Sequence, residues 1–429
     1  MTELDFDVIV IGGGIAGTVC ALRLAQFGHE VALVERGEAP GTKNLSGGVF
    51  YCDIMNEVIP DFANVAPIER VILRNHLSFL TETGHISLDV ADSRLVEAGN
   101  AVSVLRVRLD AWLAEQAEAA GVAVVPGMHV DRLLTTGGVV TGVAVGEDEL
   151  RCKVVVAADG ITSFAARSIG LRPQPANNHV ALGVKSVIEL GEDVVRSRFG
   201  LGEREGAAWA MVGEATRGLP GGGFLYTNRS SVSIGVVMRL DALLSSRQAS
   251  SDVHDAFLTH PSVAPLIDGG ELVQYGCHLT AEAGALEGPI HTDGFVVIGD
   301  AAGLTLNTGF AIRGMDLAAG SALVAADAIS QALRANDYAS GGLERYPTML
   351  AASTVGADVA TYKNAPDALA EDALYREIGP LLGTIFHDIY RHDDTPHRHA
   401  WQIAKDAVVA SPVKLRDLAR VAWKGGRSL

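Results

Sequence analysis

The stretch VIVIGGGIAGTVCALRLAQFGHEVALVER, from Val8 to Arg36, decides the fold. An apolar run ends in a glycine-rich turn, a helical pattern covers residues 15–28, and a second apolar run ends at Glu35. This order of strand, turn, helix and strand is typical of a βαβ unit that binds a dinucleotide. In the G-x-G-x-x-G spacing, the glycines allow a tight turn, close approach of a pyrophosphate, and close packing of helix on strand.

The ligand contacts of this unit follow from the same residues. The helix that starts after the glycine turn offers free backbone N–H groups to phosphates. Glu35 lies where a carboxylate accepts hydrogen bonds from ribose hydroxyls, and its charge disfavours the 2′-phosphate of NADP. FAD and NAD remain as candidates, and a plain packing turn, which would not need Glu35, is the alternative. The residues predicted to bind the dinucleotide here are Gly12, Gly14, Ile15, Ala16, Gly17, Glu35 and Arg36.

Composition limits the class of protein. The 429 residues, 48% of them hydrophobic, suffice for two or three domains. A net charge of −17 argues against a nucleic-acid partner, because phosphates would go unneutralised. We expect neither a secretory signal nor a membrane-spanning segment, since acidic residues precede a short, glycine-interrupted apolar run. Four scattered cysteines exclude an iron–sulfur cluster held by this chain alone and favour the reducing cytoplasm.

The remaining patterns predict an α/β protein with a split Rossmann-like domain. Residues 70–95 alternate like an antiparallel hairpin, residues 106–121 form an amphipathic helix, and residues 180–277 read as a mostly antiparallel sheet. We therefore predict three regions, the first two discontinuous. They are a dinucleotide-binding domain of residues 1–70, 100–180 and 278–335, an inserted substrate domain of residues 71–99 and 181–277, and a helical C-terminal region of residues 336–429.

Two further motifs favour FAD over NAD. The segments VVVAADGITS (154–163) and GFVVIGDAAGLTLNTGFAIRGMDLAAGSA (294–322) each run from an apolar strand into a turn with Asp and Gly. Asp300 could bind a polyol chain, although a turn-forming role is its alternative. A helix opening near Gly309 would direct N–H groups at the negative charge of a reduced flavin.

The three motifs together resemble the FAD-binding fold of the p-hydroxybenzoate hydroxylase type. Four segments resemble more closely the FixC family, which is related to electron transfer flavoprotein:quinone oxidoreductase. They are APGTKNLSGG (39–48), RVRLDAWLAEQAEAAG (106–121), GGGFLYTN (221–228) and GDAAGLTLNTGFAIRGMDLA (299–318). The resemblance covers nearly the whole chain, and GTKNLSGG and NTGFAIRGMD are its most specific parts.

The resemblance implies further FAD-binding residues. It places one loop near the isoalloxazine, Arg106 at the phosphates, the Val130 backbone at the adenine, and a Gly-Asp turn at the ribitol. A surface ion pair is the alternative for Arg106, and a solvent-facing position the alternative for Lys43. The implied residues are Lys43, Asn44, Gly47, Gly48, Arg106, Val130, Asp159, Gly160, Gly299, Asp300, Gly309, Phe310, Ala311 and Ile312.

The resemblance also implies a function. FAD would accept electrons from an electron transfer flavoprotein and pass them to a quinone, within a Fix-type complex that can bifurcate electrons from NADH. A separate ferredoxin-like iron–sulfur subunit would replace the cluster domain of the quinone oxidoreductases, because no cysteine follows Cys277. No catalytic acid, base or nucleophile is required. The alternatives are a stand-alone geranylgeranyl or prenyl reductase, an aromatic monooxygenase, and a non-catalytic nucleotide-binding protein.

Two C-terminal segments carry weaker signals. The His- and Asp-rich segment FHDIYRHDDTPHRHA (386–400) lacks the spacing of a metal site, so we expect a polar loop and no metal. The tail SPVKLRDLARVAWKGGRSL (411–429) interleaves basic and apolar residues in an otherwise acidic protein. It predicts peripheral contact with the inner face of the membrane or with a partner protein, and a solvated helix is the alternative.

Overall fold

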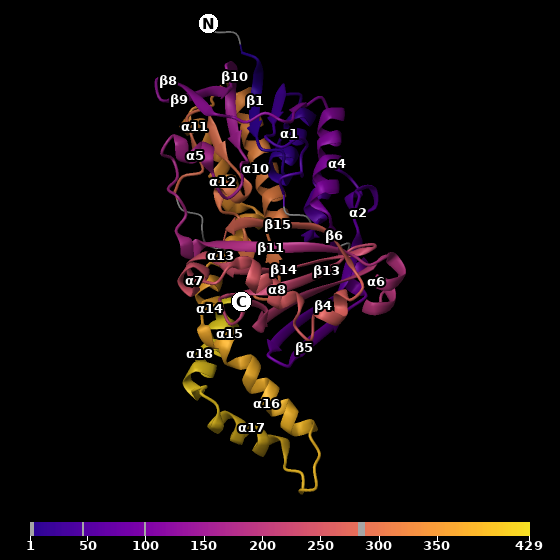
Figure 1. Cartoon of the computed structure of the whole chain (residues 1–429). Coiled ribbons are helices and arrows are strands. Elements are labelled where there is room, and N and C mark those ends of the chain that lie inside the picture. Colours follow the sequence, from indigo (N-terminus) through magenta and orange to yellow (C-terminus); the bar gives the residue numbers. More distant parts are fainter. Residues whose placement is uncertain (1–3, 45–46, 98–99, 282–287) are drawn as a thin grey trace.

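The computed structural model describes residues 4–44, 47–97, 100–281 and 288–429. Figure 1 shows a part with mostly parallel strands at the top, a broad second sheet below it, and an arm of two helices at the bottom. The predicted α/β architecture, with a helical C-terminal region, is confirmed.

The first sheet carries the N-terminal strand in its middle. Its path is β16-β17-β10-β1-β2-β7, and β9 pairs with both β10 and β8. β1 is parallel to β2 and to β10, with Ile11 opposite Val34 and Ala157, so the carboxyl ends of these strands meet at one edge. The bounds are β1 Phe6–Ile11, β2 Val31–Val34, β7 Ala123–Val125, β8 Arg132–Thr136, β9 Val139–Val145, β10 Asp148–Ala157, β16 His291–Thr292 and β17 Phe295–Val297.

α1 (Ile15–Gln26) packs on this sheet and on two further helices. It contacts both α4 (Arg106–Ala119) and α10 (Met315–Arg334). Small residues let the backbones approach, because the facing stretches of α1 and α10 are rich in alanine, glycine and serine, and most are fully buried. This packing fixes the start of α1 beneath the carboxyl ends of the strands.

The second sheet is mostly antiparallel, as predicted. Its order is β15-β11-β14-β13-β12-β4-β6-β3, β5 pairs with β4, and β12 runs parallel to β4. Its own core lies between the sheet and short helices such as α8. The bounds are β3 Gly48–Tyr51, β4 Arg70–Thr81, β5 Gly84–Ala91, β6 Ala101–Val104, β11 Val180–Glu189, β12 Glu205–Gly213, β13 Gly221–Thr227, β14 Ser231–Arg239 and β15 Glu271–Ala281.

The two sheets are linked through short strands. β3 and β6 fall within the ranges predicted for the dinucleotide-binding domain, yet they pair into the second sheet, with Val71 of β4 opposite Val102 of β6. The loop before β3 therefore spans both sheets. The domain boundaries themselves stay a prediction.

Short helices complete the chain, and the helical character predicted for residues 336–429 is present. α16 packs on β4, β5 and α17, whereas α18 packs on α14 and α15. Figure 1 shows α16 and α17 projecting from the body as a hairpin. In the described ranges, no helix has both the length and the apolarity to cross a bilayer. The remaining helices are α2 Phe62–Val65, α3 Arg94–Glu97, α5 Phe164–Ser168, α6 Glu192–Phe199, α7 Leu240–Ser246, α8 Ser250–Leu258, α9 Ala264–Ile267, α11 Ser340–Leu343, α12 Arg345–Ala352, α13 Thr354–Thr361, α14 Ala365–Leu369, α15 Asp372–Arg376, α16 Ile378–Tyr390, α17 Ala400–Ala410 and α18 Leu415–Ser428.

Candidate functional site

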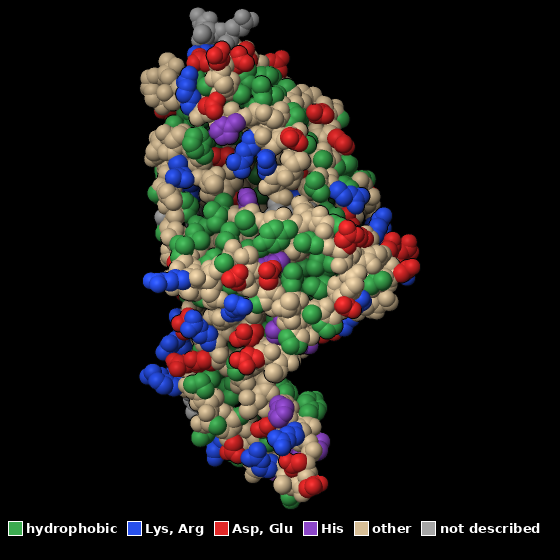
Figure 2. Space-filling view, viewed as in Figure 1, with side chains coloured by type: hydrophobic (Ala, Val, Ile, Leu, Met, Phe, Trp, Pro, Cys, Tyr) green, Lys and Arg blue, Asp and Glu red, His purple; other side chains and the backbone are tan. Residues whose placement is uncertain are grey.

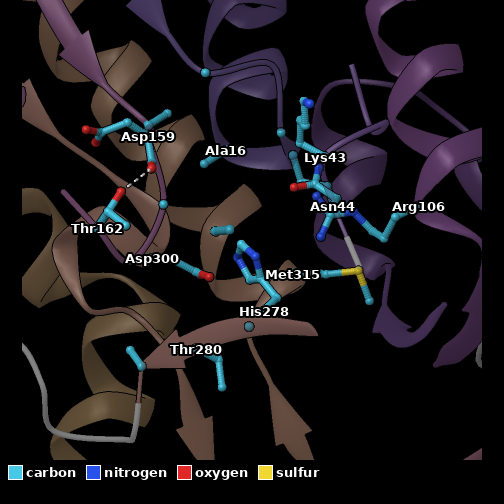
Figure 3. A pocket seen from close by; sticks show the side chains of 18 of the residues that line it. Ala16, Lys43, Asn44, Arg106, Asp159, Thr162, His278, Thr280, Asp300 and Met315 are labelled. Carbon is cyan, nitrogen blue, oxygen red and sulfur yellow. Dashed lines mark hydrogen bonds between the residues drawn. The ribbon is translucent and has the colours of Figure 1, made fainter. Parts of the chain in front are cut away.

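A cavity of about 430 Å³ lies between the carboxyl ends of the parallel strands and the second sheet. Ile11, Val34 and Ala158 line it from the first sheet, and strands β11, β13, β14 and β15 line it from the other. Figure 3 shows Asp159 and Thr162 on one side, with Lys43, Asn44 and Arg106 opposite and His278 and Thr280 below. The volume is that of a small-molecule or cofactor site.

The glycine turn keeps one end of the cavity open for an anion. A Cβ at Gly17 would overlap the backbone oxygen of Gly12, so this position brings α1 close to the turn. A Cβ at Gly14 would meet only side-chain nitrogens, at 3.6 and 3.9 Å, which leaves space above α1. α1 begins at Ile15 without a side-chain cap. Its first N–H groups are therefore available to a phosphate.

Glu35 lies at the end of β2, beside that turn. Its two carboxylate oxygens accept hydrogen bonds from the backbone N–H groups of Gly13 (2.8 Å) and Gly37 (2.5 Å). The side chain is 9% exposed and lines the cavity. These bonds fix the carboxylate and leave lone pairs for hydroxyl donors. Arg36 and the mostly buried Val130 line the same end.

Arg106 belongs to a buried polar cluster at the start of α4. Its Nε and Nη2 each donate to Asp110, over 2.7 Å, and Asn44 Nδ2 donates to the same carboxylate over 2.5 Å. Asp110 is fully buried. Burial alone would lower the pKa of Arg106, but Asp110 and Asp300 together raise it above its ordinary value. The ion pair of Arg106 is therefore buried and not at the surface, contrary to the alternative given above. It holds the Arg106 side chain in the wall of the cavity.

Two carboxylates in the cavity wall keep acceptor capacity. Asp159 Oδ2 accepts the N–H of Ala165 over 2.9 Å, whereas Oδ1 is buried without a partner among the described residues. Burial raises the pKa of both Asp159 and Asp300, with Arg106 opposing the shift at Asp300. Buried polar atoms are normally hydrogen-bonded. The hydroxyls of a nucleotide and of a polyol chain would supply the missing donors, so these residues fit FAD.

The segment around Gly309 differs from the prediction. We expected a helix to open there, but residues 306–313 form a small hairpin of β18 (Leu306–Asn307) and β19 (Ile312–Arg313), and α10 begins only at Met315. Gly309 has φ +77°, and Thr308 and Ala311 exchange backbone and side-chain hydrogen bonds that close a reverse turn. On this side of the cavity, the helix N–H groups that could face a ligand therefore belong to the start of α10 and not to residues near Gly309.

The structure brings most of the predicted residues to the cavity. Those that line it are Gly12, Gly14, Ile15, Ala16, Glu35, Arg36, Lys43, Asn44, Gly47, Gly48, Arg106, Val130, Asp159, Gly160, Asp300 and Ile312. Gly17 and Gly299 pack behind it, since a Cβ at Gly299 would lie 2.8 Å from Ala16 Cβ. Gly309, Phe310 and Ala311 do not line it, and Phe310 is 66% exposed.

The sequence predicted that the inserted sheet, with GGGFLYTN (221–228), shapes a pocket over the flavin, but it did not identify the individual residues of this sheet that line the cavity. They alternate along their strands toward the cavity, but the side of an isolated strand that faces a ligand cannot be read from its sequence. Arg313 also reaches the cavity and is held by ion pairs to Asp316 and Asp358, both 2.6 Å. The missed lining residues include Gly183, Lys185, Phe224, Tyr226, Val237, His278, Thr280, Thr305, Asn307, Arg313 and Met315.

The two C-terminal segments lie away from the cavity. Among the described residues, no group of three His, Cys, Asp or Glu side chains is placed to hold a metal ion. The stretch 391–399 connects α16 and α17 without regular structure, as expected for a polar loop. The basic tail forms α18, in which Lys424 and Arg420 pair with Glu371 while Trp423 is 66% exposed.

Comparisons with known proteins agree with this geometry. The family model of FAD-dependent oxidoreductases matches residues 7–85. The chain is 39% identical over 400 residues to a probable electron transfer flavoprotein-quinone oxidoreductase, YdiS of Escherichia coli K12, covering 93% of each chain. It is 39% identical to the protein FixC of Salmonella typhi, covering 92% of each. A geranylgeranyl bacteriochlorophyll reductase-like protein of Thermoplasma acidophilum shares the fold, with TM-score 0.71, 20% identity, and coverage of 97% of this chain and 99% of that one.

Proposed function

The chain belongs to the family of FixC and the electron transfer flavoprotein-quinone oxidoreductases, and we propose that it carries electrons from an electron transfer flavoprotein to a quinone. It is an FAD-dependent oxidoreductase. The observation that supports the proposal is a single cavity with two different ends. One end has the start of α1 and carboxylates in its wall, and the other is lined by apolar and aromatic groups of the second sheet. Such a cavity can hold FAD and bring a second ring against it.

The cofactor contacts are proposed from the geometry of the site. FAD supplies two-electron chemistry when bound. The first turn of α1 and Arg106 would bind the pyrophosphate, and Glu35 the adenosine ribose. Asp300 would accept hydrogen bonds from the ribityl chain. Gly17 and Gly299 were predicted to bind FAD but do not line the cavity. They would support FAD binding indirectly, because they allow close packing behind the cavity wall.

The quinone is assigned to the side of the cavity formed by the second sheet. The Phe224 and Tyr226 rings stack there at 5.1 Å, and Met315 at the start of α10 lines the same cavity. Aromatic rings favour stacking on a flat quinone ring. Burial raises the pKa of Tyr226 above its ordinary value, so its hydroxyl stays protonated and can donate to a quinone oxygen.

The proposed partners follow from cysteine placement. Cys20, Cys52 and Cys152 are buried, and burial raises the pKa of the Cys52 thiol to about 11 and that of Cys152 to about 12. Thiols in such surroundings are poor metal ligands, because the thiolate is the ligand form. We propose that a separate ferredoxin-like subunit supplies the iron–sulfur cluster, within a Fix-type complex that can bifurcate electrons.

Anaerobic reduction of the purified protein tests the electron path. We expect the visible absorbance of its oxidised flavin to bleach only when an electron transfer flavoprotein and NADH are both present. The absorbance should return when a quinone is added. Bleaching by NADPH alone, accelerated by a phenol or a prenyl lipid, would contradict the proposal and favour a monooxygenase or a prenyl reductase.

The basic tail is proposed to hold the protein on the inner face of the membrane. Trp423 on α18 is 66% exposed, and the Arg427 guanidinium lies 5.0 Å from its ring centroid. An aromatic ring flanked by cations suits the interface of an anionic bilayer. Figure 2 shows several Lys and Arg side chains at the left edge of the molecule, above the arm, with Asp and Glu side chains between them.

Replacing Trp423 with serine should lower the fraction bound to anionic vesicles several-fold, measured by co-sedimentation. Trp401 on the arm is the matched control, because it is equally exposed and also has a cation over its ring, Lys405 at 5.6 Å. We expect the Trp401→Ser protein to bind like the wild type. An equal loss in both variants would rule out attachment through α18 alone.

A further inference from the structure

Lys185 is a buried cationic side chain that the proposed electron path does not yet use. It lies on β11, is 3% exposed, and lines the cavity. Its Nζ donates to the backbone oxygen of Gly47 and lies 5.6 Å from the centroid of the Phe224 ring. Within the described ranges, it forms no ion pair with a carboxylate. A buried lysine without a counter-charge is costly, so its retention needs a reason.

The charges around the Lys185 amine are mostly positive. Burial first, and then the Arg106 guanidinium on α4, hold the pKa of Lys185 well below its ordinary value. The carboxylate Asp300 lies near Arg106 and is itself buried with a raised pKa. Burial and the nearby guanidinium thus both favour the neutral form of the amine. The other titratable groups that line the cavity are Glu35, Arg36, Lys43, Tyr226, His129, Arg132, Asp159, His278 and Arg313.

The backbone of Gly47, directly before β3, lies against this amine. Gly47 has φ +81°, and a Cβ there would lie 2.9 Å from Lys185 Nζ and would overlap Ser233 Oγ. Glycine is thus required for the backbone oxygen to reach the lysine. This contact joins the second sheet to the loop that contains Lys43 and Asn44, where the resemblance places the isoalloxazine.

We propose that Lys185 faces the redox-active ring and balances the negative charge that the ring gains on reduction. Two electrons and one proton delivered to the ring add one negative charge to the cavity. Lys185 takes up a second proton from solvent, so its neutral amine becomes an ammonium beside that charge. The net change in charge is then zero, and reduction becomes more favourable in a site of low polarity. The inference rests on the proposed placement of FAD in this cavity.

The test is a spectroscopic redox titration of the FAD-loaded protein across neutral pH. For a two-electron couple, each proton taken up changes the potential by about 30 mV per pH unit. We expect about 60 mV per pH unit for the wild type, since two protons accompany two electrons. Lys185→Met should lower the potential and reduce the slope to about 30 mV per pH unit. Lys363→Met, which removes an exposed lysine outside the cavity, should match the wild type.

Unfolding of the apoprotein separates this role from a structural one. A depressed folded-state pKa means that the unfolded chain binds more protons at neutral pH. Lys185 therefore costs stability below the ordinary pKa of lysine, and the cost fades as the pH rises toward that value. Lys185→Met should unfold at or above the wild-type midpoint at pH 7.

Three outcomes decide the inference. An equal slope and potential in the wild type and in Lys185→Met would overturn it. A lowered unfolding midpoint together with an unchanged potential would show a purely structural lysine. A wild-type protein that fails to retain FAD would instead overturn the proposed site, and with it the proposed function.

Discussion

Replacing Gly17 with alanine is expected to abolish stable FAD binding and to destabilise the protein by about 3 kcal/mol, the upper end of the usual cost of overpacking. The added methyl group would overlap the backbone oxygen of Gly12, and Ala158 Cβ lies only 3.2 Å away on the other side. Neither neighbour is the end of a flexible side chain, so α1 must move away from β1. That movement shifts the helix start that is proposed to hold the pyrophosphate, and binding is lost together with packing.

The measurement is urea unfolding of the apoprotein together with the flavin content of the purified protein. Gly341→Ala is the matched control, because Gly341 lies in α11 and a Cβ there would meet no atom within 4 Å. Alanine at an exposed helical position should be neutral or slightly stabilising. A Gly17→Ala protein that keeps wild-type stability and flavin would contradict the close approach of α1 and the glycine turn.

The part of the candidate site that is proposed to bind the dinucleotide could be predicted, because its residues lie close together in the sequence. Gly12, Gly14 and Glu35 lie within one βαβ unit, so their relative positions follow from the geometry of strand, turn and helix. The pairing of β10 beside β1 likewise brings Asp159 to the same edge. The helical tail was predictable for the same reason, because its periodicity is local.

Residues brought in by long-range pairing could not be predicted in this way. Lys185 and His278 reach the cavity only because β11 and β15 are neighbours in a sheet whose order differs from the order along the chain. Asp110 lies within the quoted segment 106–121, but its contact with Asn44 joins residues 66 positions apart. The prediction of a helix near Gly309 was wrong, because Gly309 adopts a positive φ in the turn of a short hairpin.

Removing the Asp110 carboxylate is the second change with a large expected effect. Asp110 is fully buried and receives two hydrogen bonds from Arg106 and one from Asn44. Asp110→Leu removes the only carboxylate that is hydrogen-bonded to the largely buried guanidinium among the described residues and leaves Asp300 as a weaker counter-charge. Breaking a buried pair in this way typically costs about 3 to 5 kcal/mol. It also frees Asn44 and Arg106 from the orientation in which they face the cavity. We therefore expect both the free energy of unfolding and FAD affinity to fall.

The double variant Arg106→Leu/Asp110→Leu separates these two losses. With both members of the ion pair replaced, the guanidinium that Asp110→Leu leaves unpaired is gone, so most of the stability lost in Asp110→Leu should return. FAD affinity should stay low, because the cation proposed to meet the phosphates is gone. Stability is measured by urea unfolding of the apoproteins, and affinity by fluorescence titration with FAD. Arg94→Ala, which breaks the pair of this exposed side chain with Asp92, should leave both quantities unchanged. If the double variant were as unstable as Asp110→Leu, the unpaired charge would not be the cause. If it bound FAD like the wild type, Arg106 would have no part in holding the phosphates.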